Sequence, residues 1–178
     1  MEIILMRILS VIILMLVFCK YAGDTNIIYI EGEDVDSLLD RMYPVLCEME
    51  SSGRADAIGD NGKAFGILQI HKAVVKDVNR FCDTDYHHNE MFDPRYAREV
   101  YEAYLKKGVE LYKNKMKTTP KEQDIVRMWN GGIYEGYSIF ATVKYYIKYI
   151  EVKRMLQGED VDHSFQNEVA KKIRGVRG

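Results

Sequence analysis

The chain has 178 residues, of which 47% are hydrophobic and 29% are charged, which is the composition of a folded globular protein rather than a disordered or fibrous one. This length predicts about one domain. The formal net charge of −2 excludes the strong basic field that non-specific nucleic-acid binding requires, so we expect no nucleic-acid partner.

The first 23 residues have the pattern of a secretory signal segment. Arg7 supplies a positive charge, residues 8–18 are almost entirely apolar, and small residues follow. The run is shorter than the roughly 20 apolar residues of a spanning helix, although earlier apolar residues leave an uncleaved membrane anchor as an alternative. A lipoprotein-like box ending at Cys19 is disfavoured by the bulk of Phe18. We therefore expect a periplasmic or secreted protein.

Residues 24–35 read as a loose lead-in, and a helix is expected to follow it. Apolar residues at helical spacing predict this helix from a cap at Asp36 or Ser37 to the turn at 51–53. Pro44 is expected to kink or restart it.

The next segment, residues 54–70, carries turn chemistry and predicts one short irregular hairpin. Residues 72–80 predict one or two turns of helix, and residues 83–90 predict a polar loop. A cap with Pro at the first helical position, Asp93-Pro94, then predicts a helix to about Lys113.

Two helices are predicted in the last third of the chain. Residues 119–122 (Thr-Pro-Lys-Glu) form a capping-box pattern for a helix that carries Trp129 and ends at two glycines. A final helix is expected over residues 138–156, before a basic tail at 159–178. The fold class is therefore mainly α (α+β), with one domain over residues 36–158.

Glu50 is the candidate acid at the end of the first predicted helix. At 100° per residue it falls within about 20° of Leu39 and Tyr43 on the apolar face, whereas Glu48 falls near the opposite side. Desolvation and the negative helix end are both expected to raise the pKa of Glu50. A carboxyl group that stays protonated near neutrality is suited to general acid catalysis of glycosidic cleavage. The alternative is a side chain that turns outward or pairs with Arg54.

Four segments in order resemble the lysozyme-like lytic transglycosylases, the SLT-domain family. The segments are residues 50–53 (Glu-Ser-Ser-Gly), 64–70 (Ala-Phe-Gly-Ile-Leu-Gln-Ile), 129–132 (Trp-Asn-Gly-Gly) and 142–148 (Thr-Val-Lys-Tyr-Tyr-Ile-Lys). The resemblance spans about residues 38–150. It implies a lysozyme-like fold, a helical bundle with one small β-hairpin beside the active-site cleft.

The resemblance also implies roles for individual residues. Glu50 is implied to be the single catalytic acid and base. Substrate-binding roles are implied for Ser51, Asp60, Gly66, Gln69, Asn130 and Tyr145, with Tyr146 as the competing register for Tyr145. Gln69 and Asn130 would bond the sugar chain, and Gly66 would let the backbone approach the ligand. Each also has a structural interpretation: Gln69 can satisfy a loop backbone, Asn130 can end a helix, and Tyr145 can belong to the core.

The implied activity is cleavage of the β-1,4 bond between N-acetylmuramic acid (MurNAc) and N-acetylglucosamine in peptidoglycan, giving a 1,6-anhydroMurNAc product without a cofactor. The implied partner is the peptidoglycan strand; we expect a monomer that meets the membrane only through an uncleaved or lipidated N-terminus. One alternative is a hydrolase of the goose-type lysozyme kind, which shares the turn at Asp60 but carries an aspartate where this chain has His71. Another is a non-catalytic glycan-binding or phage structural module.

Two further groups of residues concern a possible disulfide bond and a possible metal site. Cys47 and Cys82 are an even pair that an exported protein can bridge, with two buried free thiols as the alternative. Residues 82–90 hold Cys, Asp, His and Glu side chains, but not at a recognised zinc spacing, so we expect no metal site.

Overall fold

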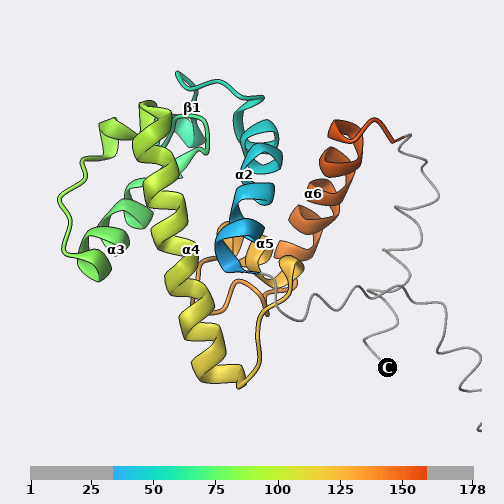
Figure 1. Cartoon of the computed structure of the whole chain (residues 1–178). Helices are drawn as coiled ribbons and strands as arrows, with labels where there is room; N and C mark the ends of the chain where they lie inside the picture. The colour runs from blue at the N-terminus through green and yellow to red at the C-terminus, as the bar shows by residue number, and fades with distance from the viewer. Residues whose placement is uncertain (1–33, 160–178) are drawn as a thin grey trace, which may run out of the picture. The chain divides into compact units, whose positions relative to one another are not determined.

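A computed structural model describes residues 34–159 of the chain (Figure 1). These residues form a mainly helical domain with a small antiparallel sheet, which confirms the predicted class. The predicted signal segment, nearly all of the lead-in and the basic tail beyond residue 159 lie outside the described residues. No helix between residues 34 and 159 is long and apolar enough to cross a membrane.

Helix α2 (Val35–Ser51) carries the candidate acid. Its apolar face, including Leu39 and Leu46, is buried, as the helical spacing predicts. Pro44 lies on the exposed side, and the helix continues through it, so the predicted restart is wrong. The helix ends where Ser52 adopts a left-handed conformation (φ 54°) and its N–H bonds the free carbonyls of the last turn.

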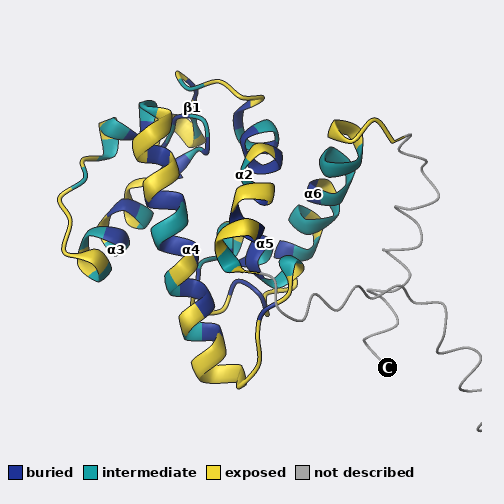
Figure 2. Ribbon diagram, in the orientation of Figure 1, coloured by how far each residue is buried: buried dark blue, intermediate teal, exposed yellow. Residues whose placement is uncertain are grey.

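Three later helices complete the bundle. α4 (Pro94–Met116) begins at the predicted cap, where the Asp93 carboxylate accepts a hydrogen bond from the backbone N–H of Arg95 at 2.9 Å. α4 and α6 (Thr142–Leu156) pack against α2, and α5 (Glu122–Gly131) packs against both α4 and α6. Figure 2 shows the buried stripes along α2 and α4. The core between the helices therefore places the end of α2 beside α5 and α6.

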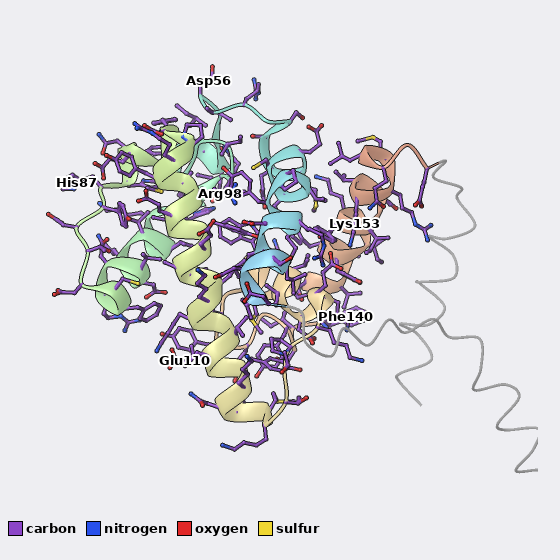
Figure 3. All side chains as sticks on the ribbon, in the orientation of Figure 1. Asp56, His87, Arg98, Glu110, Phe140 and Lys153 are labelled. Atoms are coloured by element: carbon purple, nitrogen blue, oxygen red, sulfur yellow. The ribbon has the colours of Figure 1, made fainter. Side chains whose placement is uncertain are left out.

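The start of α5 corrects the predicted capping box. Lys121 is the N-cap, and the Asp124 carboxylate accepts from its backbone N–H at 3.0 Å, two residues later than the Thr119 box. The carboxylate of Glu122, which the prediction assigned to the box, instead binds two α6 side chains. It accepts from the Tyr149 hydroxyl at 2.5 Å and, at 2.7 Å, from Nζ of Lys153, which Figure 3 labels on α6. The contacts of Glu122 with α6 therefore override the capping-box pattern in the local sequence.

Helix α6 begins at Thr142 rather than at residue 138. The hydroxyl of buried Thr142 lies 2.8 Å from the carbonyl oxygen of Gly136 and accepts from Arg127 Nε at 2.9 Å. These contacts hold residues 133–141 as turns before the helix starts.

The predicted hairpin has three short strands. β1 (Ile58–Gly59), β2 (Ala64–Phe65) and β3 (Ile70–His71) form an antiparallel sheet in chain order, with the short 3₁₀ helix η1 (Asp60–Gly62) between the first two. Helix α3 (Lys72–Cys82) follows directly and is longer than predicted.

The predicted polar loop that follows α3 also contains structure. Residues His88–Phe92 form the 3₁₀ helix η2. Both η2 and α3 pack against α4. These two elements therefore hold the sheet region against the longest helix of the domain.

The cysteine bridge is not formed. Cys47 and Cys82 are both free thiols; Cys47 is buried in α2, whereas Cys82 is exposed at the last residue of α3. One side chain faces the core and the other faces solvent, so the two sulfur atoms do not meet. The alternative of two buried thiols holds for Cys47 alone, and burial raises the pKa of its thiol to about 11.

Candidate active site

Glu50 lies in the last turn of α2, where side chains from two other helices reach one of its carboxylate oxygens. Oε1 accepts a hydrogen bond from Trp129 Nε1 in α5 at 3.2 Å and another from the Tyr145 hydroxyl in α6. Oε2 has no hydrogen-bond partner among residues 34–159. Arg54 does not pair with Glu50, because its Nε donates to the Ser51 carbonyl at 3.3 Å. The carboxyl group is therefore anchored through one oxygen, and the other oxygen is left to carry a proton.

The environment of Glu50 favours its protonated form. Burial raises the pKa of Glu50, and this effect outweighs the lowering caused by the Tyr145 and Trp129 donors and by the charge of Lys148. The two donors act in the opposite sense, since they stabilise the carboxylate once the proton has left. The same group can thus release a proton and later take one back.

A hollow of about 300 Å³ opens in front of Glu50. Its walls come from the ends of α2 and α5, from the sheet, and from the start of α3. The lining residues are Glu50, Asp60, Ala64, Leu68, Gln69, Ile70, His71, Val74, Trp129 and Asn130. The structure therefore brings four of the predicted site residues, Glu50, Asp60, Gln69 and Asn130, around one cavity.

Tyr145 and Tyr146, the two candidates for one substrate-binding role, have different surroundings. Burial and the neighbouring Glu50 raise the pKa of Tyr145 far above its ordinary value, so this hydroxyl keeps its proton and donates a hydrogen bond to Glu50. Tyr146 instead stacks on Tyr149, with ring centroids 6.2 Å apart. Tyr145, and not Tyr146, is therefore the tyrosine that contacts Glu50. Its hydroxyl bonds the Glu50 carboxylate and does not line the hollow.

Two residues around Glu50 were not predicted as site residues. The Trp129 ring packs edge-on against Tyr101 and Tyr104, with centroids 5.4 and 6.3 Å apart, which fixes the direction of its N–H. Lys148 Nζ donates to the Met49 carbonyl at 3.2 Å, at the negative end of α2. Lys148 follows Tyr145 by three residues on a helix, so this spacing was a signal that both side chains share one face.

Ser51 and Gly66 lie next to the site but do not line the hollow. The buried Ser51 hydroxyl donates to the Ile67 carbonyl at 2.8 Å, which ties the end of α2 to the turn before β3. Gly66 has a φ of 75°, and a Cβ atom there would lie 1.8 Å from the carbonyl oxygen of Met91. The close approach expected of Gly66 is therefore made to the backbone of η2, and both residues hold the sheet region in place.

Gln69 faces the hollow with its amide nitrogen already bonded. Its Nε2 donates to the carbonyls of Ala57 at 3.2 Å and Gly66 at 2.9 Å. Its Oε1 fills the space beside Gly59, where a Cβ atom would lie 2.0 Å away. This matches the structural interpretation, in which Gln69 satisfies a loop backbone, and it leaves no amide N–H for a sugar.

The polar groups open to a ligand are Asp60, His71 and Asn130. Asp60 Oδ2 lies 3.7 Å from His71 Nε2, and both side chains are about half exposed. Asn130 is exposed next to the C-terminal residue of α5 and has no side-chain hydrogen bond within the described part of the chain. Two hydrogen-bonding side chains and one carboxylate thus stand around the mouth in front of the acid.

Neither metal chemistry nor similarity to known proteins adds a residue to this site. In residues 34–159, no three His, Cys, Asp or Glu side chains are grouped to hold a metal ion. Comparisons with protein-family models, with curated proteins and with solved structures find no match to the chain.

Proposed function

We propose that the chain is an exported enzyme that cleaves the MurNAc–GlcNAc β-1,4 bond of peptidoglycan, acting as a lytic transglycosylase with Glu50 as its only acid and base. One observation carries this proposal: Glu50 has a raised pKa at the edge of a hollow, and its Oε1 is anchored by Trp129 and Tyr145. Burial that favours the protonated form of a carboxyl group is what general acid catalysis needs.

The proposed reaction uses Glu50 twice, first as an acid and then as a base. Glu50 gives its proton to the bridging oxygen as the bond from that oxygen to C1 of MurNAc breaks. The substrate's own acetamido group stabilises the cationic C1, in place of a second carboxylate. The Glu50 carboxylate, steadied by its two donors, then takes the proton of the C6 hydroxyl while the C6 oxygen bonds to C1. The 1,6-anhydro product forms without consuming water, and Glu50 ends protonated, as it began.

The described residues offer polar contacts for a glycan strand around the hollow in front of the acid. Asn130 presents an unbonded amide from α5, and Asp60 and His71 present hydrogen-bonding groups from the sheet region. We place substrate binding on these three residues. Ser51, Gly66 and Gln69 support the site by holding the turn that forms its wall.

A goose-type lysozyme-like hydrolase is the second candidate, and one observation favours it. Asp60 lines the same hollow as Glu50, where a second carboxylate could hold an attacking water. Asp60 Oδ2 lies 3.7 Å from His71 Nε2, however, and both side chains are about half exposed to solvent. Asp60→Asn separates the candidates, because it should remove hydrolysis but leave most transglycosylation.

Activity on purified cell walls tests the proposal against a non-catalytic binding module. Glu50→Gln keeps the size of the side chain but cannot exchange a proton, so cleavage in a zymogram should fall by a factor of at least about 100. Glu48→Gln is the matched control, since Glu48 lies on the same helix and does not line the hollow. Wild-type protein that binds cell walls without cleaving them would support the binding module instead.

A further inference from the structure

Lys148 of α6 lies beside the candidate acid, and the reaction proposed for Glu50 gives it no role. The side chain is exposed, and its Nζ donates to the carbonyl oxygen of Met49, the residue before Glu50, at 3.2 Å. Three residues earlier on the same helix, the Tyr145 hydroxyl donates to the Glu50 carboxylate. Two donors from one face of α6 therefore bind two consecutive residues in the last turn of α2.

The Met49 carbonyl is a group that α2 does not satisfy by itself. The last carbonyls of a helix lack the N–H group four residues further on that would bond to them within the helix. The N–H groups of residues 52–54, which follow α2, bond to carbonyls other than that of Met49. Met49 is buried, so its carbonyl needs a donor from another element. Lys148 supplies this donor, and its charge is favourable at the negative end of the helix.

The bond from Lys148 to Met49 also constrains the position of the Tyr145 hydroxyl. Tyr145 and Lys148 are one turn apart on α6, so this bond holds the turn that carries Tyr145 against the end of α2. A tyrosine ring is rigid and turns about only two side-chain bonds, so its hydroxyl follows the position of the backbone. The hydroxyl stabilises the Glu50 carboxylate only within hydrogen-bond distance. Loss of the Lys148 bond should therefore weaken the Tyr145 bond as well.

Several titratable groups surround Glu50 and bear on its protonation. They are Tyr145 and Lys148 from α6, His71 from β3, Asp60 from η1 and Cys47 from α2 itself. Helix α5 adds the N–H of Trp129, which carries no charge. The charge of Lys148 lowers the pKa of Glu50 more than that of His71 does, although burial still dominates and raises the pKa. Lys148 thus opposes the burial of the acid both by its charge and through Tyr145.

We propose that Lys148 is a positioning residue, which holds the Tyr145 hydroxyl on the Glu50 carboxylate and places a positive charge beside it. This proposal rests on the proposed function and deepens it, because it concerns how a buried acid stays strong enough to give up its proton. A carboxyl group whose pKa is raised too far holds its proton too tightly to protonate the bridging oxygen of the glycan. Lys148 limits this rise without contacting the substrate.

A direct titration of Glu50 tests the proposal without any cleavage. The full chain is labelled with 13C at the glutamate side-chain carboxyl carbon, its signals are followed by NMR across pH, and Glu50→Gln identifies the signal of Glu50. The variants are Lys148→Met, which keeps the aliphatic stem but removes the charge and the donor, and Lys148→Arg, which keeps both. Lys144→Met is the matched control, because Lys144 is an exposed lysine one turn earlier on α6. Tyr145→Phe is measured alone and combined with Lys148→Met.

We expect Lys148→Met to raise the pKa of Glu50 by at least about half a pH unit, and Lys148→Arg and Lys144→Met to leave it near the wild-type value. Tyr145→Phe should raise the pKa of Glu50 less in the Lys148→Met protein than in the wild type, because the bond that it removes is already weakened.

Three results would overturn the proposal. An unchanged pKa of Glu50 in Lys148→Met, or an equal rise in Lys144→Met or Lys148→Arg, would show that Lys148 has no specific effect on the acid. A full Tyr145→Phe shift in the Lys148→Met protein would show that Lys148 does not hold Tyr145. The proposed function fails separately, if wild-type protein does not cleave cell walls, and the titration result stands in either case.

Discussion

Tyr145→Phe removes one of the two hydrogen bonds to Glu50 Oε1 and should shift the pH dependence of cleavage. The Tyr145 donor lowers the pKa of Glu50 more than the Trp129 donor does, and the Trp129 bond of 3.2 Å is long for a donor to a charged acceptor. A hydrogen bond to a charged group contributes about 1.5–3 kcal/mol, which corresponds to roughly 1–2 pKa units. Loss of the Tyr145 hydroxyl should therefore raise the pKa of Glu50 by about that amount.

The sign of the effect on activity follows from the need for the protonated acid. Cleavage falls as pH rises through the pKa of Glu50, so Tyr145→Phe should move this alkaline limb upward by about 1–2 pH units. The assay is the rate of cell-wall clearing across pH for wild type, Tyr145→Phe and Tyr146→Phe. Tyr146 is the matched control, because it stacks on Tyr149 and does not contact Glu50. An unchanged or lowered limb in Tyr145→Phe would refute the account of the acid.

The remaining predictions concern stability and thiol exposure. Gly66→Ala should lower the melting temperature far more than Gly62→Ala, because both have positive φ but only at Gly66 does a Cβ meet backbone within 4 Å. A thiol reagent should modify Cys82 in the folded protein and Cys47 only on unfolding. Glu50→Gln should be at least as stable as wild type in thermal melts at neutral pH. The pKa of Glu50 is raised in the folded protein, so ionising this group costs stability. Wild type therefore loses stability as pH rises from the pKa of the unfolded state, about 4.3, to the pKa of the folded state. A lower melting temperature for Glu50→Gln across that range would contradict the raised pKa.

The helices and the position of the acid could be predicted because their signals are local. The apolar spacing around Leu39 and Leu46 places Glu50 on the inner face of α2, and the Asp93-Pro94 cap starts α4 where it was expected. Angular position on one helix is a property of nearby residues, which a sequence shows directly. The raised pKa of Glu50 followed from the same geometry.

The residues that complete the site could not be predicted from local pattern, because their partners are distant in the chain. Trp129 donates to Glu50 across 79 positions, and nothing around residue 129 marks that bond. Gly66 resembled a ligand contact, yet the backbone of Met91 occupies the space beside it. The Glu122 carboxylate does not form the predicted capping box and instead accepts a hydrogen bond from Tyr149 of α6. In each case a tertiary contact took a group whose local sequence favoured another role.

The disulfide prediction failed for a related reason. An even pair of cysteines indicates only that a bridge could form, whereas geometry decides whether the two sulfur atoms meet. Cys47 lies on the buried face of α2, and Cys82 lies at the exposed end of α3. The face of α2 could have been read from the sequence, but the burial of the end of α3 could not.

Mass spectrometry of the muropeptides released from purified cell walls tests the central claim most directly. The account predicts that wild-type protein releases products ending in 1,6-anhydroMurNAc, each lighter by one water than the hydrolysis product, and that Glu50→Gln releases none while Glu48→Gln matches wild type. Products with a reducing MurNAc end would show that the enzyme is a hydrolase. Equal release of anhydro products by Glu50→Gln and wild type would show that the acid lies elsewhere and would contradict the account.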